Sequence, residues 1–252
     1  MASLHLQDLT VEFPIYQASG RSLKKALFSA PLVGSNLARD ASNRIQVRAL
    51  NHLTLSIEKG DRVGLIGPNG SGKTTLLKTL AGIYEPTGGA LHIQGRISAL
   101  LDVSLGLNPE ATGRENIMLR GMYMGIHPKD MQGHVEEVVE FTELGPYIDM
   151  PVRTYSAGMM LRLAFAASTC VEPEILLMDE WLAAGDSHFL AKAQKRMEDF
   201  VQRSSLMVLA SHSLDLLGKW CNKGLYLRNG NVIAYGPLAE VADIYQQSLA
   251  DT

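Results

Sequence analysis

The stretch RVGLIGPNGSGKTTLLKTLAG, residues 62–82, joins an apolar run to a helical pattern through a glycine-rich turn. Its first part, RVGLIG, is typical of a strand that is buried on both faces. After the turn, Leu76, Leu77 and Leu80 lie on one side of a predicted helix. Gly82 follows at the position where a helix C-terminus often has glycine. The stretch therefore predicts a strand, a tight turn and a helix in succession.

Apolar runs and helical patterns continue to alternate towards the C-terminus. ILLM, residues 175–178, and LMVLASH, residues 206–212, are predicted buried strands, and residues 188–202 between them are a predicted helix. This alternation predicts an α/β fold whose core is a mainly parallel sheet. In residues 4–13, apolar and polar side chains alternate as in a half-exposed antiparallel strand, and residues 106–155 have a helical pattern.

Three other stretches carry local signals. Residues 90–101 have strand character, and Asn229 with Gly230 is typical of the tight turn of a β-hairpin. Pro128 opens a stretch with one apolar helical face. That face is predicted to hold Met131, Val135, Val138 and Val139.

The glycine-rich turn GPNGSGKT, residues 67–74, fits the pattern G-x-x-x-x-G-K-[ST], with a buried strand before it and a helix after it. In that context the glycines let backbone N–H groups close around phosphate oxygens. Lys73 is placed to reach the β- and γ-phosphates of ATP or GTP, and the Thr74 hydroxyl to hold Mg²⁺. The predicted nucleotide contacts are Gly67, Asn69, Gly70, Ser71, Gly72, Lys73, Thr74 and Thr75.

Two acids and a histidine follow the other predicted buried strands. Asp179 and Glu180 come directly after ILLM, and His212 ends LMVLASH. Ligands of open α/β sheets bind at the carboxyl ends of the strands, so these side chains should meet the phosphates there. We expect Asp179 to hold Mg²⁺ through its water shell, Glu180 to act as general base towards the attacking water, and His212 to donate to the γ-phosphate.

Small residues open a further predicted helix in TYSAGMMLRLA, residues 154–164. The phosphate loop, this helix start, the acid pair and the histidine together resemble an ATP-binding cassette (ABC) ATPase, in the family's order and spacing. The resemblance implies a RecA-like P-loop core with an antiparallel β-subdomain and a helical subdomain. It also implies a head-to-tail homodimer with two ATP molecules, each held between one phosphate loop and the helix start of the other copy. The implied contacts across that interface are Ser156, Ala157 and Gly158.

The resemblance implies roles for other residues as well. Asp186 would be the acid of the D-loop that follows the acid pair. Tyr16 is the best candidate to stack on adenine, with Phe13 behind it, although plain strand packing explains either aromatic equally well. For Trp181, beside the acids, packing is the expected role.

The implied organisation is a single nucleotide-binding domain over residues 1–252. Residues 1–100 and 165–236 would form the β-subdomain and the RecA-like core. Residues 101–164 would form the helical subdomain, and residues 237–252 a C-terminal helix.

The sequence departs from the general family pattern in three places. YSAGM stands where LSGGQ is usual, which removes the glutamine of that signature. Residues 101–105, at the position of the glutamine loop, contain no glutamine, and Asp102 is the nearest group able to approach Mg²⁺. WLAAGD follows the acid pair in place of PTSALD. DEWLAAGDSHF, TGRENI and a long insert after the first strand together resemble one branch, the ATPase subunits that export lipid-linked O-antigen, capsule, teichoic acid or galactan.

That branch implies partners. Two copies of a membrane-spanning permease would join two copies of this chain, and the complex would carry a lipid-linked glycan. Glu110 and residues 112–126 would form the groove for the cytoplasmic helices of the permease. The chain would be peripheral, on the cytoplasmic face of the inner (plasma) membrane. An ATPase subunit of a lipid or drug exporter is the alternative. DNA-maintenance ABC ATPases would need a long coiled coil or zinc-site cysteines, and translation-associated ones a second cassette; the sequence has none of these.

Charge is unevenly distributed along the chain. Overall, 23 basic and 26 acidic residues give a net charge of −3, whereas residues 17–48 contain six basic residues and one acid, a net charge of +5. A globally acidic protein argues against nucleic-acid binding. The basic segment fits anionic lipid headgroups or the diphosphate of a polyprenyl-linked glycan, and equally a solvated loop. No apolar run approaches the roughly 20 residues of a membrane span, so we expect a soluble protein.

Overall fold

The computed structural model describes residues 2–14, 37–39, 45–101, 106–179 and 187–250. The chain divides into two compact units: unit 1 is Met1–Gly95 with Leu206–Thr252, and unit 2 is Arg96–Ser205. Unit 2 is longer than the predicted helical subdomain, and the predicted subdomain boundaries stay a prediction.

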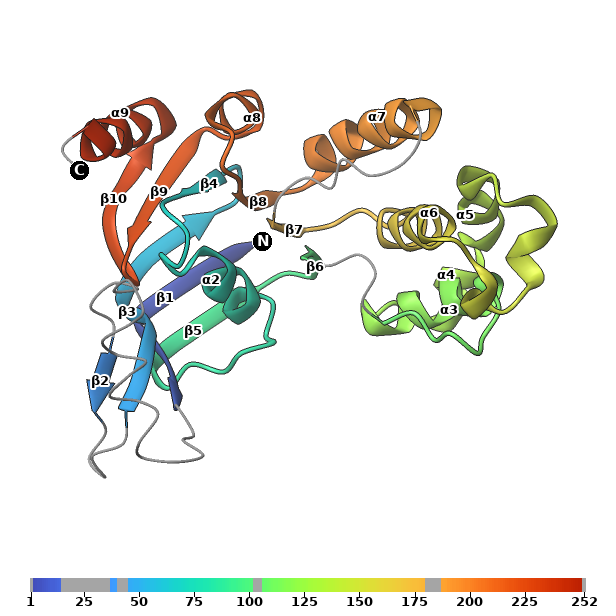
Figure 1. Ribbon diagram of the computed structural model, residues 1–252, viewed down its shortest axis with the longest axis horizontal. Coiled ribbons are helices and arrows are strands. Elements are labelled where there is room, and N and C mark those ends of the chain that lie inside the picture. Colours follow the sequence, from blue (N-terminus) through green and yellow to red (C-terminus); the bar gives the residue numbers. More distant parts are fainter. Residues whose placement is uncertain (1, 15–36, 40–44, 102–105, 180–186, 251–252) are drawn as a thin grey trace, which may run out of the picture. The chain divides into compact units, whose positions relative to one another are not determined.

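Unit 1 contains an antiparallel sheet in the order β2-β3-β1-β5 (Figure 1). Leu4, Leu6 and Leu9 of β1 are buried and Gln7 is exposed, which confirms the half-exposed antiparallel strand predicted over residues 4–13. The strands of this sheet are β1 (Ser3–Pro14), β2 (Leu37–Arg39), β3 (Ile45–Glu58) and β5 (Gly88–Gln94).

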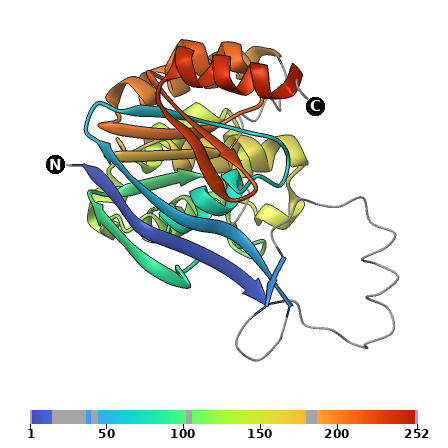
Figure 2. The same ribbon diagram turned by 90° about the vertical axis from the view of Figure 1, so that its left-hand side faces the viewer.

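The other strands of unit 1 lie in the order β10-β9-β4-β8, with β9, β4 and β8 parallel and β10 antiparallel to β9. β8 is buried along its whole length, as expected for a parallel strand, and it ends at Ala210, two residues earlier than predicted. The C-terminal helix α9 packs on β9 and β10 (Figure 2). These elements are β4 (Arg62–Ile66), α2 (Lys73–Leu80), β8 (Leu206–Ala210), α8 (Leu214–Trp220), β9 (Lys223–Arg228), β10 (Asn231–Pro237) and α9 (Leu238–Ala250).

The strand-like stretch over residues 90–101 contains two strands. β5 ends at Gln94, and β6 begins three residues later at Ile97. Gly95 between them has a φ of 108°, in the left-handed region that glycine adopts without strain. The chain passes from unit 1 to unit 2 directly after this glycine.

Unit 2 contains two parallel strands, β6 and β7, and most of the helices of the described chain (Figure 1). Its elements are β6 (Ile97–Leu100), α3 (Gly113–Tyr123), α4 (Pro128–Gln132), α5 (Val135–Thr142), η1 (Gly145–Asp149), η2 (Val152–Thr154), α6 (Ala157–Ser168), β7 (Ile175–Asp179) and α7 (Ser187–Arg203). Among the described residues, no helix combines the length and the apolar sequence needed to cross a membrane.

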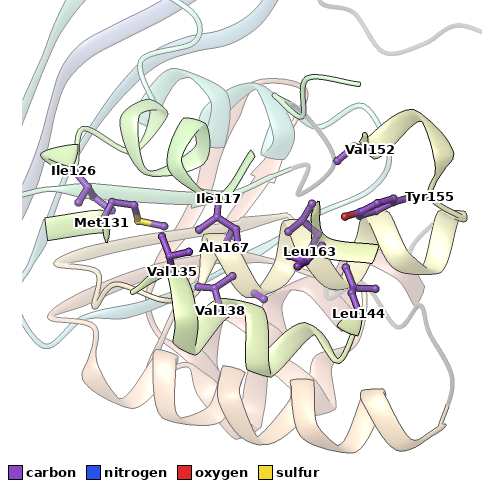
Figure 3. Packing of buried hydrophobic residues seen from close by; sticks show 12 residues of the cluster. Ile117, Ile126, Met131, Val135, Val138, Leu144, Val152, Tyr155, Leu163 and Ala167 are labelled. Carbon is purple, nitrogen blue, oxygen red and sulfur yellow. The ribbon is translucent and has the colours of Figure 1, made fainter. Parts of the chain in front are cut away.

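Apolar side chains from α3 to α6 form the core of the helical part of unit 2 (Figure 3). Met131, Val135 and Val138, which were predicted to share a face, are buried in this core, and Val139 packs against it. Gly133 lies where the predicted helical stretch divides into α4 and α5. Other members of the core are Ile117, Ile126, Leu144, Ile148, Val152, Tyr155, Leu163, Ala166 and Ala167.

Candidate functional site

The glycine-rich loop lies between β4 and α2, as the sequence predicted. Gly72, with a φ of 109°, is the N-cap of α2. A glycine has no side chain to accept from the first N–H groups of the helix, so these donors stay available for an anion. A Cβ on Gly67 would collide with the carbonyl oxygen of Leu227, so the backbones of the loop and β9 approach too closely for any other residue. The loop is therefore shaped as a phosphate cradle.

Two side chains of the loop complete this cradle. Lys73 is buried, and its Nζ donates to the carbonyl oxygens of Gly67 at 2.7 Å and Pro68 at 3.0 Å. The hydroxyl of Ser71 is buried and has no hydrogen-bond partner among the described residues. A buried hydroxyl without a partner costs about 1–3 kcal/mol, which a phosphate oxygen at this position would recover. The residues of the loop thus fit a nucleoside triphosphate.

His212 lies at the same sheet edge as the phosphate loop. β4 and β8 pair in parallel, with Leu65 opposite Ala210, so their carboxyl ends lie at one edge. Gly67 directly follows β4, and the exposed His212 comes two residues after β8. The structure therefore brings His212 to the edge that carries the loop, and its γ-phosphate role stays a prediction.

The aromatic residues proposed for adenine stacking have different outcomes. Phe13 packs edge-on against Tyr84, with ring centroids 5.1 Å apart. Lys78 Nζ lies 5.6 Å from the centroid of the same Tyr84 ring. Phe13 therefore has a packing partner within unit 1, which supports the alternative of plain packing. Tyr16 lies outside the described residues.

The acid pair begins at the end of β7. Residues Ile175 to Met178 are buried, and Asp179, the last residue of the strand, is half-buried. An apolar strand thus delivers a carboxylate to its carboxyl end, as predicted. Glu180, Asp186 and Asp102 lie outside the described residues, and their roles stay predictions.

The start of α6 is the predicted contact with the nucleotide of another copy. Ser156 is the N-cap, and its Oγ accepts from the N–H of Met159 at 3.3 Å. Ser156, Ala157 and Gly158 are all exposed, and a Cβ on Gly158 would have only Ser156 Oγ within 4 Å. Just before them, the buried Tyr155 donates its hydroxyl to the carbonyl oxygen of Tyr147 at 2.6 Å. An anchored but open helix start is suited to a ligand that comes from outside unit 2.

The motif TGRENI, which served only as a family marker, shapes the start of α3. Thr112 and Glu115 form a capping box, a role that the T-x-x-E spacing could have revealed. The buried Asn116 accepts from the N–H of Asn108 at 2.7 Å and donates to its carbonyl oxygen at 2.9 Å. Gly113 lies so close to the Tyr155 hydroxyl that a Cβ would collide with it. This motif therefore fixes the loop before α3.

A shallow groove of about 540 Å³ lies beside the start of α3. Glu110, predicted to face the permease, lines it and forms an ion pair with Arg153 at 3.5 Å. Further along α3, Met122 and Tyr123 are 57% and 71% exposed. The helix that lines the groove thus also has exposed apolar side chains near its C-terminus. Its lining is Asn108, Glu110, Ala111, Glu115, Met118 and Leu119.

The relatives of this chain include two O-antigen export proteins. The chain is 45% identical over 219 residues to the O-antigen export system ATP-binding protein RfbB of Myxococcus xanthus, covering 87% of this chain but 49% of that protein. It is 40% identical over 230 residues to the O-antigen export system ATP-binding protein RfbE of Yersinia enterocolitica, covering 91% of this chain and 96% of that protein. These names confirm the predicted resemblance to polysaccharide exporters.

The fold also matches solved structures. The dimeric structure of a post-hydrolysis state of the ATP-binding cassette MJ0796, bound to ADP and Pi, superposes with a TM-score of 0.66 at 19% identity. The match covers 93% of this chain and 98% of that one, which confirms the predicted P-loop ABC fold. The family model for ABC transporters matches residues 50–183, a range that includes the phosphate loop, the signature and the acid pair. Together with the relatives, this match shows that the chain belongs to the ABC transporter family, as an ATP-hydrolysing nucleotide-binding domain.

Proposed function

We propose that this chain is the ATP-hydrolysing subunit of an ABC exporter that moves a lipid-linked polysaccharide across the inner membrane with a separate permease. One observation carries the substrate class: the likeness to the O-antigen export protein of Yersinia enterocolitica extends over nearly the full length of both chains. An accidental likeness of phosphate loops would be confined to the nucleotide site. The observed likeness to the Yersinia protein also includes the helices of unit 2, where specificity for a permease would lie.

The nucleotide site supports a division of roles among this chain's residues. The start of α2 and Lys73 would bind the β- and γ-phosphates, and His212 would donate to the γ-phosphate. Glu180 would take the proton of the attacking water. Thr74 and Asp179 would hold Mg²⁺, whose charge would neutralise the phosphates; the exposed hydroxyl of Thr74 on the first turn of α2 fits that use.

Two copies of the chain would form a head-to-tail dimer. The open start of α6, with Ser156, Ala157 and Gly158 exposed, supports this arrangement, because it offers N–H groups to a phosphate held by the other copy. Closure of the dimer on ATP and its reopening after hydrolysis would drive the permease.

The groove beside α3 would receive a cytoplasmic helix of the permease. The ion-paired Glu110 together with the apolar Met118 and Leu119 suits a partner helix with apolar and basic side chains. Since no described helix can span a membrane, the permease would supply the spans, and this chain would be peripheral on the cytoplasmic face.

A deletion strain tests the proposal. Loss of this chain should leave lipid-linked glycan inside the cell, and plasmid-borne wild-type chain should restore its export. The Glu180→Gln chain should be produced at the same level and co-purify with the permease but fail to restore export. Accumulation of a lipid without a glycan, or of a small hydrophobic compound, would favour the alternative of a lipid or drug exporter. Normal export without the chain would contradict the proposal.

A further inference from the structure

Three distant segments of backbone meet at the phosphate loop. They are the first part of β3 at Ala49, the loop at Gly72, and the turn between β9 and β10 at Gly230. A Cβ on Gly72 and a Cβ on Gly230 would each lie 2.7 Å from the carbonyl oxygen of Ala49. Both glycines have a left-handed φ, 109° and 73°. One carbonyl oxygen is thus enclosed between two glycines that are far apart in sequence.

Gly230 also bonds to both neighbouring segments through its backbone. Its N–H donates to the carbonyl oxygen of Ser71 at 2.9 Å, and its own carbonyl oxygen accepts from the N–H of Asn51 at 2.8 Å. Figure 2 shows the turn of this hairpin beside the start of α2. The turn therefore links β3 to the residue of the loop whose hydroxyl is buried without a partner.

Side chains hold the turn itself in place. Asn229 and Gly230 have φ values of 51° and 73°, as a two-residue hairpin turn with both residues left-handed requires. Asn231 Nδ2 donates to the carbonyl oxygen of Asn229 at 2.8 Å, and Asn51 Nδ2 donates to Asn231 Oδ1 at 2.7 Å. Arg48 continues this chain of bonds by donating to Asn51 Oδ1 at 3.2 Å. These hydrogen bonds fix the turn relative to β3 independently of its contact with the loop.

We propose that the β9–β10 turn positions the phosphate loop for nucleotide, with Gly230 as a positioning residue for nucleotide affinity. The inference rests on the proposed binding of phosphates by the loop. Recognition by backbone N–H groups depends on their directions, and a misplacement of about 1 Å can remove much of the gain from such a preorganised site. Gly230 fixes the carbonyl oxygen of Ser71, so it fixes the peptide groups that lead into α2.

Gly230→Ala tests the proposal. The added Cβ would meet the Ala49 carbonyl, and alanine is strained at this φ, so the turn must shift away from Ser71. We expect the Kd of the full chain for a fluorescent ATP analogue to rise about tenfold, and the Kd for ADP by a similar factor. The hydrolysis rate at saturating ATP should stay within about twofold, because bound phosphates themselves order the loop.

Gly236→Ala is the matched control, because it makes the same change in the same hairpin at a glycine with nothing within 4 Å of the added Cβ. Its Kd should equal that of the wild type. A purely structural role for Gly230 would lower the melting temperature and the active fraction but leave the Kd of the folded protein unchanged. Binding is therefore measured well below the melting temperature of each variant.

Asn231→Ala provides a milder variant if Gly230→Ala does not fold, because it removes only the side-chain bonds to Asn51 and Asn229. It should raise the Kd about threefold, because the net stabilisation of the turn by these side-chain hydrogen bonds is small. Wild-type Kd values in the folded Gly230→Ala chain, or in Asn231→Ala if the former does not fold, would overturn the proposal. Failure of the wild-type chain to bind ATP would instead overturn the proposed nucleotide function.

Discussion

The starts of α2 and α6 are both predicted to bind nucleotide phosphates, yet they are built in opposite ways. At α2, the N-cap is Gly72, enclosed by backbone from other strands of unit 1. At α6, the N-cap is Ser156, whose side chain accepts from the helix, and the next two residues are exposed. The start of α2 is thus enclosed by other segments of its own chain, whereas the start of α6 is exposed.

This difference matches two kinds of phosphate contact. The enclosed start of α2 gives a rigid set of donors, with the buried Ser71 hydroxyl and Lys73 beside them. The exposed start of α6 has room above it, since a Cβ on Gly158 would meet nothing nearer than 4.0 Å. A site with that room can receive a nucleotide bound to a second molecule. In a dimer, each ATP would then lie between an enclosed helix start in one copy and an exposed helix start in the other.

The largest expected effect is on ATP hydrolysis, from a substitution that leaves both helix starts unchanged. Glu180→Gln removes the proposed general base but leaves the phosphate contacts, so steady-state ATP hydrolysis should fall by about 10²–10⁴. Nucleotide affinity should be unchanged, and gel filtration with ATP should show a stable dimer. Hydrolysis at the wild-type rate would show that another group takes the proton.

An identical substitution at the two starts tests the comparison directly. Gly72→Ala places a Cβ 2.7 Å from the Ala49 carbonyl oxygen at a φ of 109°, so we expect a strain of roughly 1–3 kcal/mol and at least a tenfold loss of ATP affinity. Gly158→Ala has space and a helical position, so it should keep the ATP affinity of the single chain and raise its stability by up to about 1 kcal/mol.

The readouts are nucleotide titration and chemical unfolding of both variants. Gly158→Ala should still reduce ATP-dependent dimerisation, because its methyl group narrows the open surface of α6. Equal affinities in the two variants would remove the distinction between the starts.

A smaller effect is expected at the N-cap of α6. Ser156→Ala removes the acceptor for the Met159 N–H, which should cost about 1 kcal/mol in the free energy of unfolding. Ser156→Asp keeps a capping oxygen and should restore the stability, but its charge should repel phosphate across the dimer. Denaturant unfolding together with ATPase assays checks both results, and full activity in Ser156→Asp would contradict a phosphate contact at this start.

The smallest effect is expected at the cysteines, one in each unit. Burial raises the pKa of Cys170 to about 11 and that of Cys221 to about 12. At pH 8 only about one thiol in a thousand or fewer would be ionised, so both should react very slowly with a thiol reagent in the folded chain. Unfolded protein, which should release two reactive thiols, is the control. Rapid labelling of only one cysteine would show that its unit opens more readily than the other.

Much of the site could be predicted because its signals are local. RVGLIG before GPNGSGKT predicts the strand, the loop and α2, and the apolar strand before Asp179 predicts an acid at a sheet edge. Parallel pairing of β4 and β8 then brings His212 to the sheet edge that carries the loop, as strand-end reasoning expected. The role of TGRENI was missed, although its capping box is visible in the spacing. The need for glycine at position 113 comes from its close approach to Tyr155 and Ile148, which are far away in the sequence.

By itself, the sequence determined the family, the order of the elements and the residue types at the phosphate loop, because apolar periodicity and glycine placement act over short distances. Tertiary structure alone decided that Gly230 would bond to Ser71 and that Ala49 would lie between two glycines. Those contacts join residues from three separate segments of the chain. Backbone hydrogen bonds and close approaches of this kind leave no spacing pattern, since they depend on how the strands pack rather than on which residues are neighbours in sequence.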